Sequence, residues 1–273
     1  MKTLTIALTA LLLSACSQSP SLTLQVFDCG EVDVRDISLF SPGVNVGENK
    51  NLVGSCYLIQ HPKGNLIWDT GITDSIGDKG VEVFGGKLKL TVSNPLAKQL
   101  AAINIKPEDI AFLGISHFHG DHTGNANLFT NSQLFIQQAE YDAAFGDTPE
   151  KFGFNPASYS QLNKEKIKII NGDHDIFGDG SVIIKTAPGH TPGHQMLLVN
   201  LEKEGPIMLS GDLYHFSKNR EHRRVPTFNF DKEQTLETME HIESFVKESG
   251  AQFWIQHDKE QNASIKHSPN IYF

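Results

Sequence analysis

Basic residues are scarce in this sequence: 23 lysines and arginines stand against 32 aspartates and glutamates, which gives a formal net charge of -9 at pH 7. Proteins that bind nucleic acid present a basic surface to the phosphates. The charge balance therefore argues against nucleic acid or an anionic lipid surface as the main partner. A neutral or locally cationic ligand meets no such objection.

Repeats, low-complexity blocks and charged linkers are also missing from the sequence. The 273 residues are 39% hydrophobic and 20% charged, a composition typical of an ordinary globular protein. A chain of this length can bury one large core. We therefore expect residues 22–273 to form a single unit.

The most apolar run lies at the N-terminus and is short. Lys2 precedes an apolar stretch from Leu4 to Leu13, and small residues follow, which indicates a signal peptide over residues 1–15 and an exported protein. Leu13-Ser14-Ala15-Cys16 resembles a bacterial lipobox. That pattern predicts a lipid on Cys16, a tether over residues 16–21, and a place in the periplasm or at the outer membrane. The alternative is an ordinary cleaved signal followed by an unrelated cysteine.

Cysteine is sparse as well. Apart from Cys16, the chain has only Cys29 and Cys56. An oxidising compartment would permit a disulfide between them. Both cysteines lie in apolar, strand-like runs, so two buried free thiols are equally consistent with the sequence. The pairing stays open at this point.

Apolar and β-branched runs alternate with helical segments, which predicts an α/β or layered α+β fold. The clearest helix is 232–249, where Asp231 can cap the N-terminus, apolar residues recur on one face, and Gly250 can end the helix. The predicted strands are 53–60, 65–69, 110–116, 133–137, 181–187, 195–200 and 206–209.

Three long segments, 41–52, 73–94 and 146–159, are rich in glycine and contain several phenylalanines. Connections of this length without secondary structure are unusual in a single domain. We expect these segments to frame a pocket, although plain surface loops with scattered aromatics are the alternative.

A dense group of metal-binding side chains follows the predicted strand 110–116. The segment 117–122 reads His-Phe-His-Gly-Asp-His, so three imidazoles and one carboxylate fall within six positions. If His117 to His119 are extended, both rings point to one side of the chain. A turn into a helix at Asp121 would bring Asp121 and His122 round to a second point. One short turn can therefore supply ligands to two metal ions.

Three further candidates lie downstream, each directly after an apolar strand. They are His190, Asp212 and His257. Functional groups of α/β folds commonly sit at such strand ends. His194 repeats the Gly-His pattern of His190 but begins a strand, which favours a supporting role over metal ligation.

The order HxHxDH, distant His, Asp, last His resembles the ligand pattern of the metallo-β-lactamase superfamily, over essentially the whole mature chain. The resemblance implies an αβ/βα sandwich with the site at one edge. It implies that one metal is held by His117, His119 and His190. A second would be held by Asp121, His122 and His257, with Asp212 bridging both.

Nitrogen and carboxylate ligands suit two Zn²⁺ ions, and other divalent transition metals also fit such a set. Two such ions lower the pKa of a water between them and polarise an attacked carbonyl, which predicts a hydrolase. Asp121 would also carry a proton toward the leaving group.

Within the superfamily the sequence resembles the N-acyl-homoserine lactonases. The stretches that carry this resemblance are 26–30, 61–71 and 254–258, together with the ligand spacings. Lactamases of this fold usually lack an aspartate at the position of Asp212. Glyoxalase II-like thioesterases add a helical domain for which the chain has no room after His257, and RNA-processing relatives carry an added domain or a basic surface. The resemblance implies a quorum-quenching hydrolase that opens the lactone ring of acyl-homoserine lactones.

One position departs from the well-known lactonases, which place a tyrosine three residues after the bridging aspartate. That position is His215 here, and Tyr214 precedes it. Either side chain could polarise the lactone carbonyl. His215 is the favoured catalytic candidate, Tyr214 is the alternative, and a mere packing role for both is a third reading.

An acyl chain needs an apolar surface beside the metals. The phenylalanines expected to supply it are Phe118, Phe84, Phe152, Phe154 and Phe216. Of these Phe118 is the first choice, because it lies between two expected ligands.

Two other functions remain compatible with the same residues. A broader lactonase, aryl-ester or organophosphate hydrolase would use the same metal-activated water. A metal-containing protein that binds a signal without turning it over belongs to a different class, but such a protein has no need for a complete dinuclear ligand set.

Overall fold

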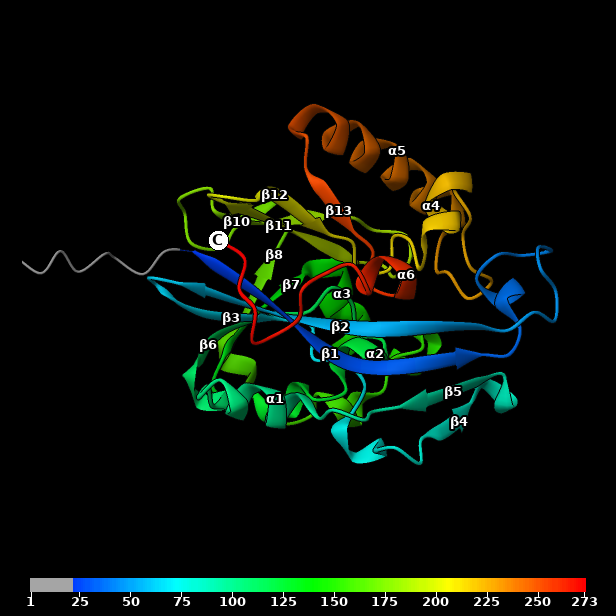
Figure 1. Ribbon diagram of the computed structural model, residues 1–273, viewed down its shortest axis with the longest axis horizontal. Helices are drawn as coiled ribbons and strands as arrows, with labels where there is room; N and C mark the ends of the chain where they lie inside the picture. The colour runs from blue at the N-terminus through cyan, green and yellow to red at the C-terminus, as the bar shows by residue number, and fades with distance from the viewer. Residues whose placement is uncertain (1–21) are drawn as a thin grey trace, which may run out of the picture.

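The computed structural model describes residues 22–273, which form two β-sheets packed face to face with helices on both outer surfaces (Figure 1). The first sheet has eight strands in the order β4-β5-β1-β2-β3-β6-β7-β8, and the second has five in the order β13-β12-β11-β10-β9. The predicted layered sandwich is confirmed. The signal peptide and tether expected for residues 1–21 lie outside the described residues.

The strands that sequence patterns predict are all present, within a few residues of the expected ends. The first sheet contains β1 (Thr23–Val34), β2 (Lys50–His61), β3 (Gly64–Trp68), β4 (Val81–Val83), β5 (Leu88–Thr91), β6 (Ile110–Gly114), β7 (Gln133–Gln137) and β8 (Ile167–Ile170). The second contains β9 (His174–Asp175), β10 (Val182–Thr186), β11 (Gln195–Leu201), β12 (Gly205–Leu209) and β13 (Gln252–Trp254).

The segment 73–94 was expected to lack secondary structure, but it contains the short antiparallel hairpin β4–β5. Its strands are only three and four residues long, and β5 pairs with the end of β1. The hairpin gains its backbone hydrogen bonds from that edge of the sheet rather than from a strong apolar pattern of its own. It extends the first sheet past the end of the sandwich (Figure 1).

Alternation along the strands builds a core in three layers. On β2, Tyr57 and Ile59 face the second sheet, whereas Cys56 and Leu58 face the helices on the outer side of the first. Those helices are α1 (Leu96–Ala102) and α3 (Gln138–Phe145). The two sheets thus share one buried cluster, and each sheet has a second cluster beneath its own helices.

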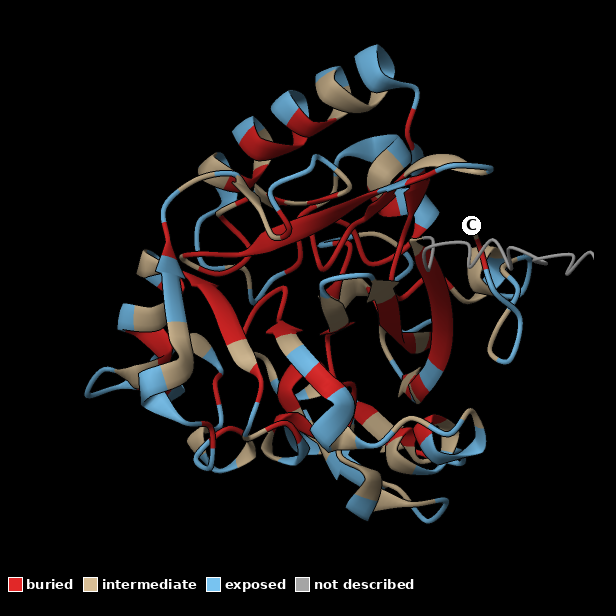
Figure 2. Cartoon of the chain, turned by 90° about the vertical axis from the view of Figure 1, so that its left-hand side faces the viewer, coloured by how far each residue is buried: buried red, intermediate tan, exposed pale blue. Residues whose placement is uncertain are grey.

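The helix α5 (Lys232–Ser249) covers the outer face of the second sheet and has the predicted bounds. The Asp231 side chain accepts a hydrogen bond from the backbone N–H of Gln234, and Gly250 ends the helix in the left-handed conformation. Met239 and Ile242 are buried against the sheet, while the opposite face is exposed (Figure 2). The remaining helices are short: α2 (Gly120–Thr123), α4 (Ser217–His222) and α6 (Lys259–Asn262).

Cys29 and Cys56 form a disulfide, which resolves the question that the sequence left open. The bond joins β1 to β2, where a bulge between Asp28 and Glu31 shifts the register of the pair. Both cysteines are buried in the cluster beneath α1. Among residues 22–273, no helix is long and apolar enough to cross a membrane.

Candidate metal centre

The segment after β6 supplies four polar side chains to one end of the sandwich. His117 and His119 lie on the same side of an extended run, as alternation predicts. The carbonyl of His119 then accepts hydrogen bonds from the N–H groups of His122 (3.1 Å) and Thr123 (3.1 Å), which closes the first turn of α2. This turn carries Asp121 and His122 to a second point beside the first.

The second sheet supplies the other three side chains. His190 lies in the connection between β10 and β11, Asp212 follows β12, and His257 follows β13. Because β12 and β13 are parallel neighbours, Asp212 and His257 emerge at the same edge. The seven side chains that the sequence singles out therefore meet where the ends of the two sheets come together, and they form two groups.

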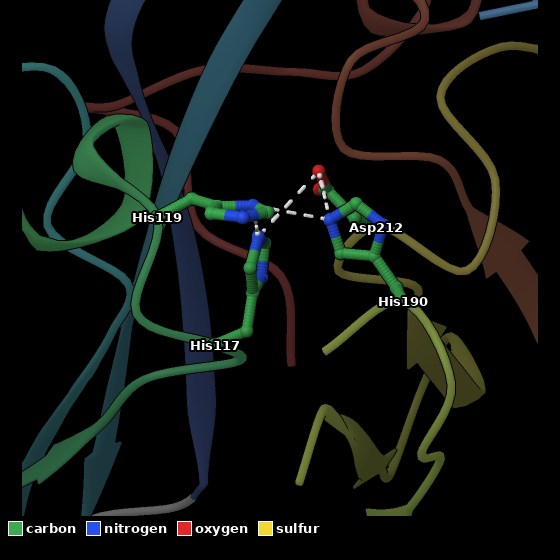
Figure 3. Close-up of side chains that lie close together, drawn as sticks. All are labelled: His117, His119, His190 and Asp212. Atoms are coloured by element: carbon green, nitrogen blue, oxygen red, sulfur yellow. Dashed lines mark hydrogen bonds and ion pairs between the residues drawn. The ribbon is translucent and has the colours of Figure 1, made fainter. Parts of the chain in front are cut away.

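The first group consists of His117, His119, His190 and one oxygen of Asp212 (Figure 3). The Nδ1 atom of His119 lies 2.8 Å from Nε2 of His117 and 3.2 Å from Nε2 of His190. The Oδ2 atom of Asp212 lies 3.3 Å from His190 Nε2 and 3.6 Å from His117 Nε2. Three nitrogens and one oxygen thus surround a single point.

The second group consists of Asp121, His122 and His257. The other oxygen of Asp212, Oδ1, lies 2.9 Å from His257 Nε2 and 3.1 Å from His122 Nε2. The Oδ2 atom of Asp121 is 3.9 Å from each of the same nitrogens. The two oxygens of the buried Asp212 carboxylate therefore face different groups, which is the geometry of a bridging ligand.

The two groups together contain five imidazoles, and each has an inner nitrogen that faces its group and an outer nitrogen that faces away from it. Every outer nitrogen lies within hydrogen-bond distance of a protein oxygen. A proton on the outer nitrogen leaves a lone pair on the inner one, as in metal-binding histidines. The outer contacts are His117 Nδ1 to Ser116 Oγ (3.1 Å), His119 Nε2 to the Phe152 carbonyl (3.0 Å), His122 Nδ1 to Asp69 (3.0 Å), His190 Nδ1 to Asn229 (3.3 Å) and His257 Nδ1 to the Val53 carbonyl (2.6 Å).

With the protons on the nitrogens that face away, five lone pairs and the carboxylates would converge, and such an arrangement requires cations. Around a tetrahedral zinc with bonds of about 2.0 Å, neighbouring ligand atoms are about 3.3 Å apart. The separations in both groups bracket that value. The donor atoms and their spacings therefore fit a divalent metal site.

Charge interactions within the centre are strong. Burial alone would raise the pKa of Asp212, but the imidazoles of His257 and His122 outweigh it and hold that pKa well below its usual range. Burial alone would lower the pKa of His122, whereas Asp212 and Asp69 outweigh it and raise the pKa well above its usual value. A divalent cation can replace the proton that His122 would otherwise hold.

Two buried residues support the ligands from behind. Asp69 was not singled out from the sequence, yet its carboxylate accepts hydrogen bonds from the Ser116 N–H (2.7 Å), the His122 ring (3.0 Å) and the Gln256 amide (2.8 Å). His194 accepts a hydrogen bond from the Asp212 N–H (2.9 Å) through Nε2. Burial lowers the pKa of His194 to about 3, so its ring is neutral and available as an acceptor.

Phe118 does not line the site, contrary to the expectation from its place between two ligands. In the extended run His117–His119, the side chain of Phe118 points to the opposite side and is fully buried. Its ring contacts Phe145 and Tyr159 in the cluster beneath α3. Phe118 therefore holds the run in place from below.

Of the other expected phenylalanines, two are buried in the core and two are at least partly exposed. Phe216 is buried in a separate cluster that includes Val34, and Phe154 is buried although its ring lies 5.6 Å from that of His119. Phe152 is half-buried, and its carbonyl contacts His119. Phe84 is 65% exposed. Of the five phenylalanines expected from the sequence, only Phe84 and Phe152 remain candidates for direct contact with a substrate.

His215 and Tyr214 point in different directions. The Nε2 atom of His215 lies 3.0 Å from Oδ2 of Asp212, and the ring packs in parallel beside His257. Tyr214 is buried with Phe253 in the cluster beneath α5, on the side away from the centre. Tyr214 as a group that polarises the substrate is therefore contradicted, because its ring packs in that cluster beside Phe253 and not beside the ligands.

An aromatic rim lies beside the metal centre; we use this term for Phe40, Phe84, Phe228 and Phe230, of which the sequence indicated only Phe84. The ring of Phe228 lies 5.9 Å from His215, 6.1 Å from His190 and 5.2 Å from Phe40. Phe84 lies 6.4 Å beyond Phe228. Phe230 packs against Phe152 at 5.7 Å. Rings on both sides of His190 thus extend from the ligands to the surface.

Comparison with known proteins identifies the family. Residues 50–247 match the model of the metallo-beta-lactamase superfamily. With this match over most of the chain, and with the fold and donor groups described above, the chain belongs to the metallo-beta-lactamase superfamily of metal-dependent hydrolases, and within it to the N-acyl homoserine lactonases.

The lactonase relatives are similar to this chain over most of their lengths. The chain is 32% identical to an N-acyl homoserine lactonase of a Bacillus species, over 86% of this chain and 92% of that one. It is 30% identical to the N-acyl homoserine lactonase AttM of Azorhizobium caulinodans, over 79% and 86%. A solved N-acyl homoserine lactone hydrolase, with N-hexanoyl-L-homoserine at its catalytic metal centre, superposes with a TM-score of 0.80 at 28% identity, covering 92% of this chain and 98% of that one.

The burial of Phe118 makes a prediction that separates a core role from substrate contact. Replacing Phe118 with Ala should lower the free energy of unfolding by about 3–5 kcal/mol, because it leaves a large cavity under the ligand run. Denaturant unfolding measures this loss. The exposed Phe230→Ala variant should stay within about 0.5 kcal/mol of the parent. Equal stability of all three proteins would contradict the assignment of Phe118 to the core.

Proposed function

We propose that this protein opens the lactone ring of N-acyl-homoserine lactones by dinuclear metal-dependent hydrolysis. The observation that carries the proposal is the Asp212 carboxylate, whose two oxygens face two separate groups of metal-binding side chains. The lactonase relatives add support, because they match this chain over nearly its whole described length.

Two zinc ions fit the two groups, with Asp212 shared between them. His117, His119 and His190 would hold the first ion, and Asp121, His122 and His257 the second. Bound there, such ions would supply an activated water and polarise the lactone carbonyl. The chain's own contribution is to fix seven ligand side chains in a mostly buried setting, where electrostatic effects are strong.

Asp121 and His215 are the side chains we assign to proton and carbonyl contacts. Asp121 is only partly buried, with 29% of its side chain accessible, so it can exchange a proton with the leaving ring oxygen and with solvent. His215 is buried at the opposite side of Asp212, and burial lowers its pKa below the usual value. A neutral His215 ring has one N–H, which is within reach of the Asp212 carboxylate at 3.0 Å, so the ring can polarise the carbonyl only when that hydrogen bond passes from Asp212 to the substrate.

The acyl chain is expected to lie along the aromatic rim. Phe228 connects His190 and His215 to the exposed Phe84, and Phe230 continues from Phe152. Phe228 and Phe230 are 37% and 53% exposed. Exposed aromatic rings beside a polar centre are suited to an amphiphilic ligand with one polar end.

Export and a lipid on Cys16 are also part of the proposal. The apolar segment 4–13 and the lipobox-like sequence ending at Cys16 support it. The disulfide between Cys29 and Cys56 is in keeping with folding in an oxidising compartment. A signal that diffuses through the cell envelope would meet the enzyme there.

Ring opening of short- and long-chain acyl-homoserine lactones by the zinc-loaded domain from Ser17 onward, followed as acid release, tests the proposed reaction. The parent protein should turn over, and Asp212→Ala should lose at least about 100-fold in rate, because both groups lose a ligand. An aryl ester provides the comparison substrate. Faster hydrolysis of the aryl ester than of any lactone would instead favour a broader esterase.

The rim makes a prediction about chain length. Phe228→Ala should raise KM more for long acyl chains than for short ones, by about 10-fold for the longest, because a lost aromatic contact costs about 1–2 kcal/mol of apolar burial. A chain-length series of KM values measures the difference. Leu128→Ala, a change at another exposed apolar residue, serves as the control. Equal KM changes at all chain lengths would place the acyl chain elsewhere.

The lipid has its own test. Cells that express the full chain and are fed labelled palmitate should incorporate label into the protein, whereas the Cys16→Ala variant should remain unlabelled. Equal labelling of both chains would rule out Cys16 as the attachment point, and absence of label from both would favour an ordinary cleaved signal.

A further inference from the structure

A buried carboxylate outside both donor groups connects the two segments that carry the three imidazoles of the first group. Glu140 lies in the first turn of α3 and is 1% exposed. Its Oε1 accepts a hydrogen bond from the backbone N–H of Phe118 (2.9 Å). Its Oε2 accepts hydrogen bonds from the Thr191 hydroxyl (2.8 Å) and the Gly193 N–H (2.8 Å).

These three contacts lie next to metal-binding side chains in the sequence. Phe118 stands between His117 and His119, and Thr191 follows His190. The first segment belongs to the first sheet, and the second connects β10 and β11 in the other sheet. One carboxylate therefore fixes the spacing between all three imidazoles of the first group.

The fit around Glu140 leaves little freedom. Gly193 packs so closely on the start of α3 that a Cβ there would lie 2.4 Å from the backbone nitrogen of Glu140. Three donors and no exposed surface mean that the carboxylate cannot exchange its partners for water. The second group has different supports: Asp69 holds His122, and the Val53 carbonyl holds His257.

We propose that Glu140 is a positioning residue for the metal ion of the first group, acting through the backbone of Phe118 and the loop Thr191–Gly193 and leaving the second group largely unaffected. The inference rests on the metal-binding role proposed above for these side chains. It assigns Glu140 to the first ion, whereas Asp69 contacts the His122 ring of the second group directly and the first group only through Ser116.

Glu140→Gln is the direct test, because glutamine keeps the size but presents an amide NH₂ in place of one oxygen. Whichever way the amide turns, its NH₂ faces a backbone N–H, of Phe118 or of Gly193, and one segment loses its anchor. The affinity of the first group should fall by about 10- to 100-fold, with the second little changed. Asp69→Asn should weaken the second group more than the first, because Asp69 contacts His122 directly.

Competition with a chelator measures the two affinities, and cadmium NMR with isotopically labelled histidine identifies which site is lost. The first group has three imidazoles and the second has two, so their signals split differently. Ala144→Gly weakens the same helix without touching the carboxylate, and should lower the melting temperature while both cadmium signals persist.

Loss of the three-imidazole signal in Glu140→Gln, with both signals intact in Ala144→Gly, is the expected result. Two unchanged affinities in Glu140→Gln would overturn the inference, as would equal loss of both sites in Glu140→Gln and Ala144→Gly. Absence of two cadmium sites in the parent would overturn the metal assignment itself. A parent that binds two ions but opens no lactone would overturn only the proposed substrate.

Discussion

The organisation of this protein depends on one buried carboxylate shared between two groups of imidazoles. Asp212 is 4% exposed, and a charge in such a place is stable only when opposite charges or metal ions surround it. Its two oxygens meet this need in two directions at once, toward His190 on one side and His257 on the other. The two sheets must therefore end close to each other, and the sandwich provides that geometry.

Each ligand is held by a contact that comes from another part of the chain. The backbone of Val53 orients His257, Asp69 orients His122, and the carbonyl of Phe152 orients His119. Such contacts select the ring nitrogen that faces the metal. These contacts also attach the long, glycine-rich loops around the centre to the two sheets.

The sequence predicted the layered fold and the seven side chains that the structure brings together, because each of these features has a local signal. The ligand run follows a strong strand, and His190, Asp212 and His257 each follow another. The same alternation that puts His117 and His119 on one side of the run puts Phe118 on the other side, in the core and not in the pocket.

Features that depend on distant contacts could not be predicted. The rim residue Phe228 is positioned by the neighbouring Thr227, whose N–H bonds to the Leu39 carbonyl at 2.8 Å, far away in the sequence. The disulfide lies at the bulge in β1, and the placing of Cys29 beside Cys56 depends on how β1 and β2 pair. The supports Asp69 and Glu140 are single carboxylates with no motif of their own, and only the packed structure shows which backbone groups they bind.

The most direct test of this account is anomalous diffraction at the zinc absorption edge from crystals of the zinc-loaded protein. The account predicts two peaks about 3.5–4 Å apart, each in contact with a different oxygen of Asp212. A single peak, or two peaks of which only one contacts Asp212, would contradict the shared carboxylate on which the proposed chemistry depends.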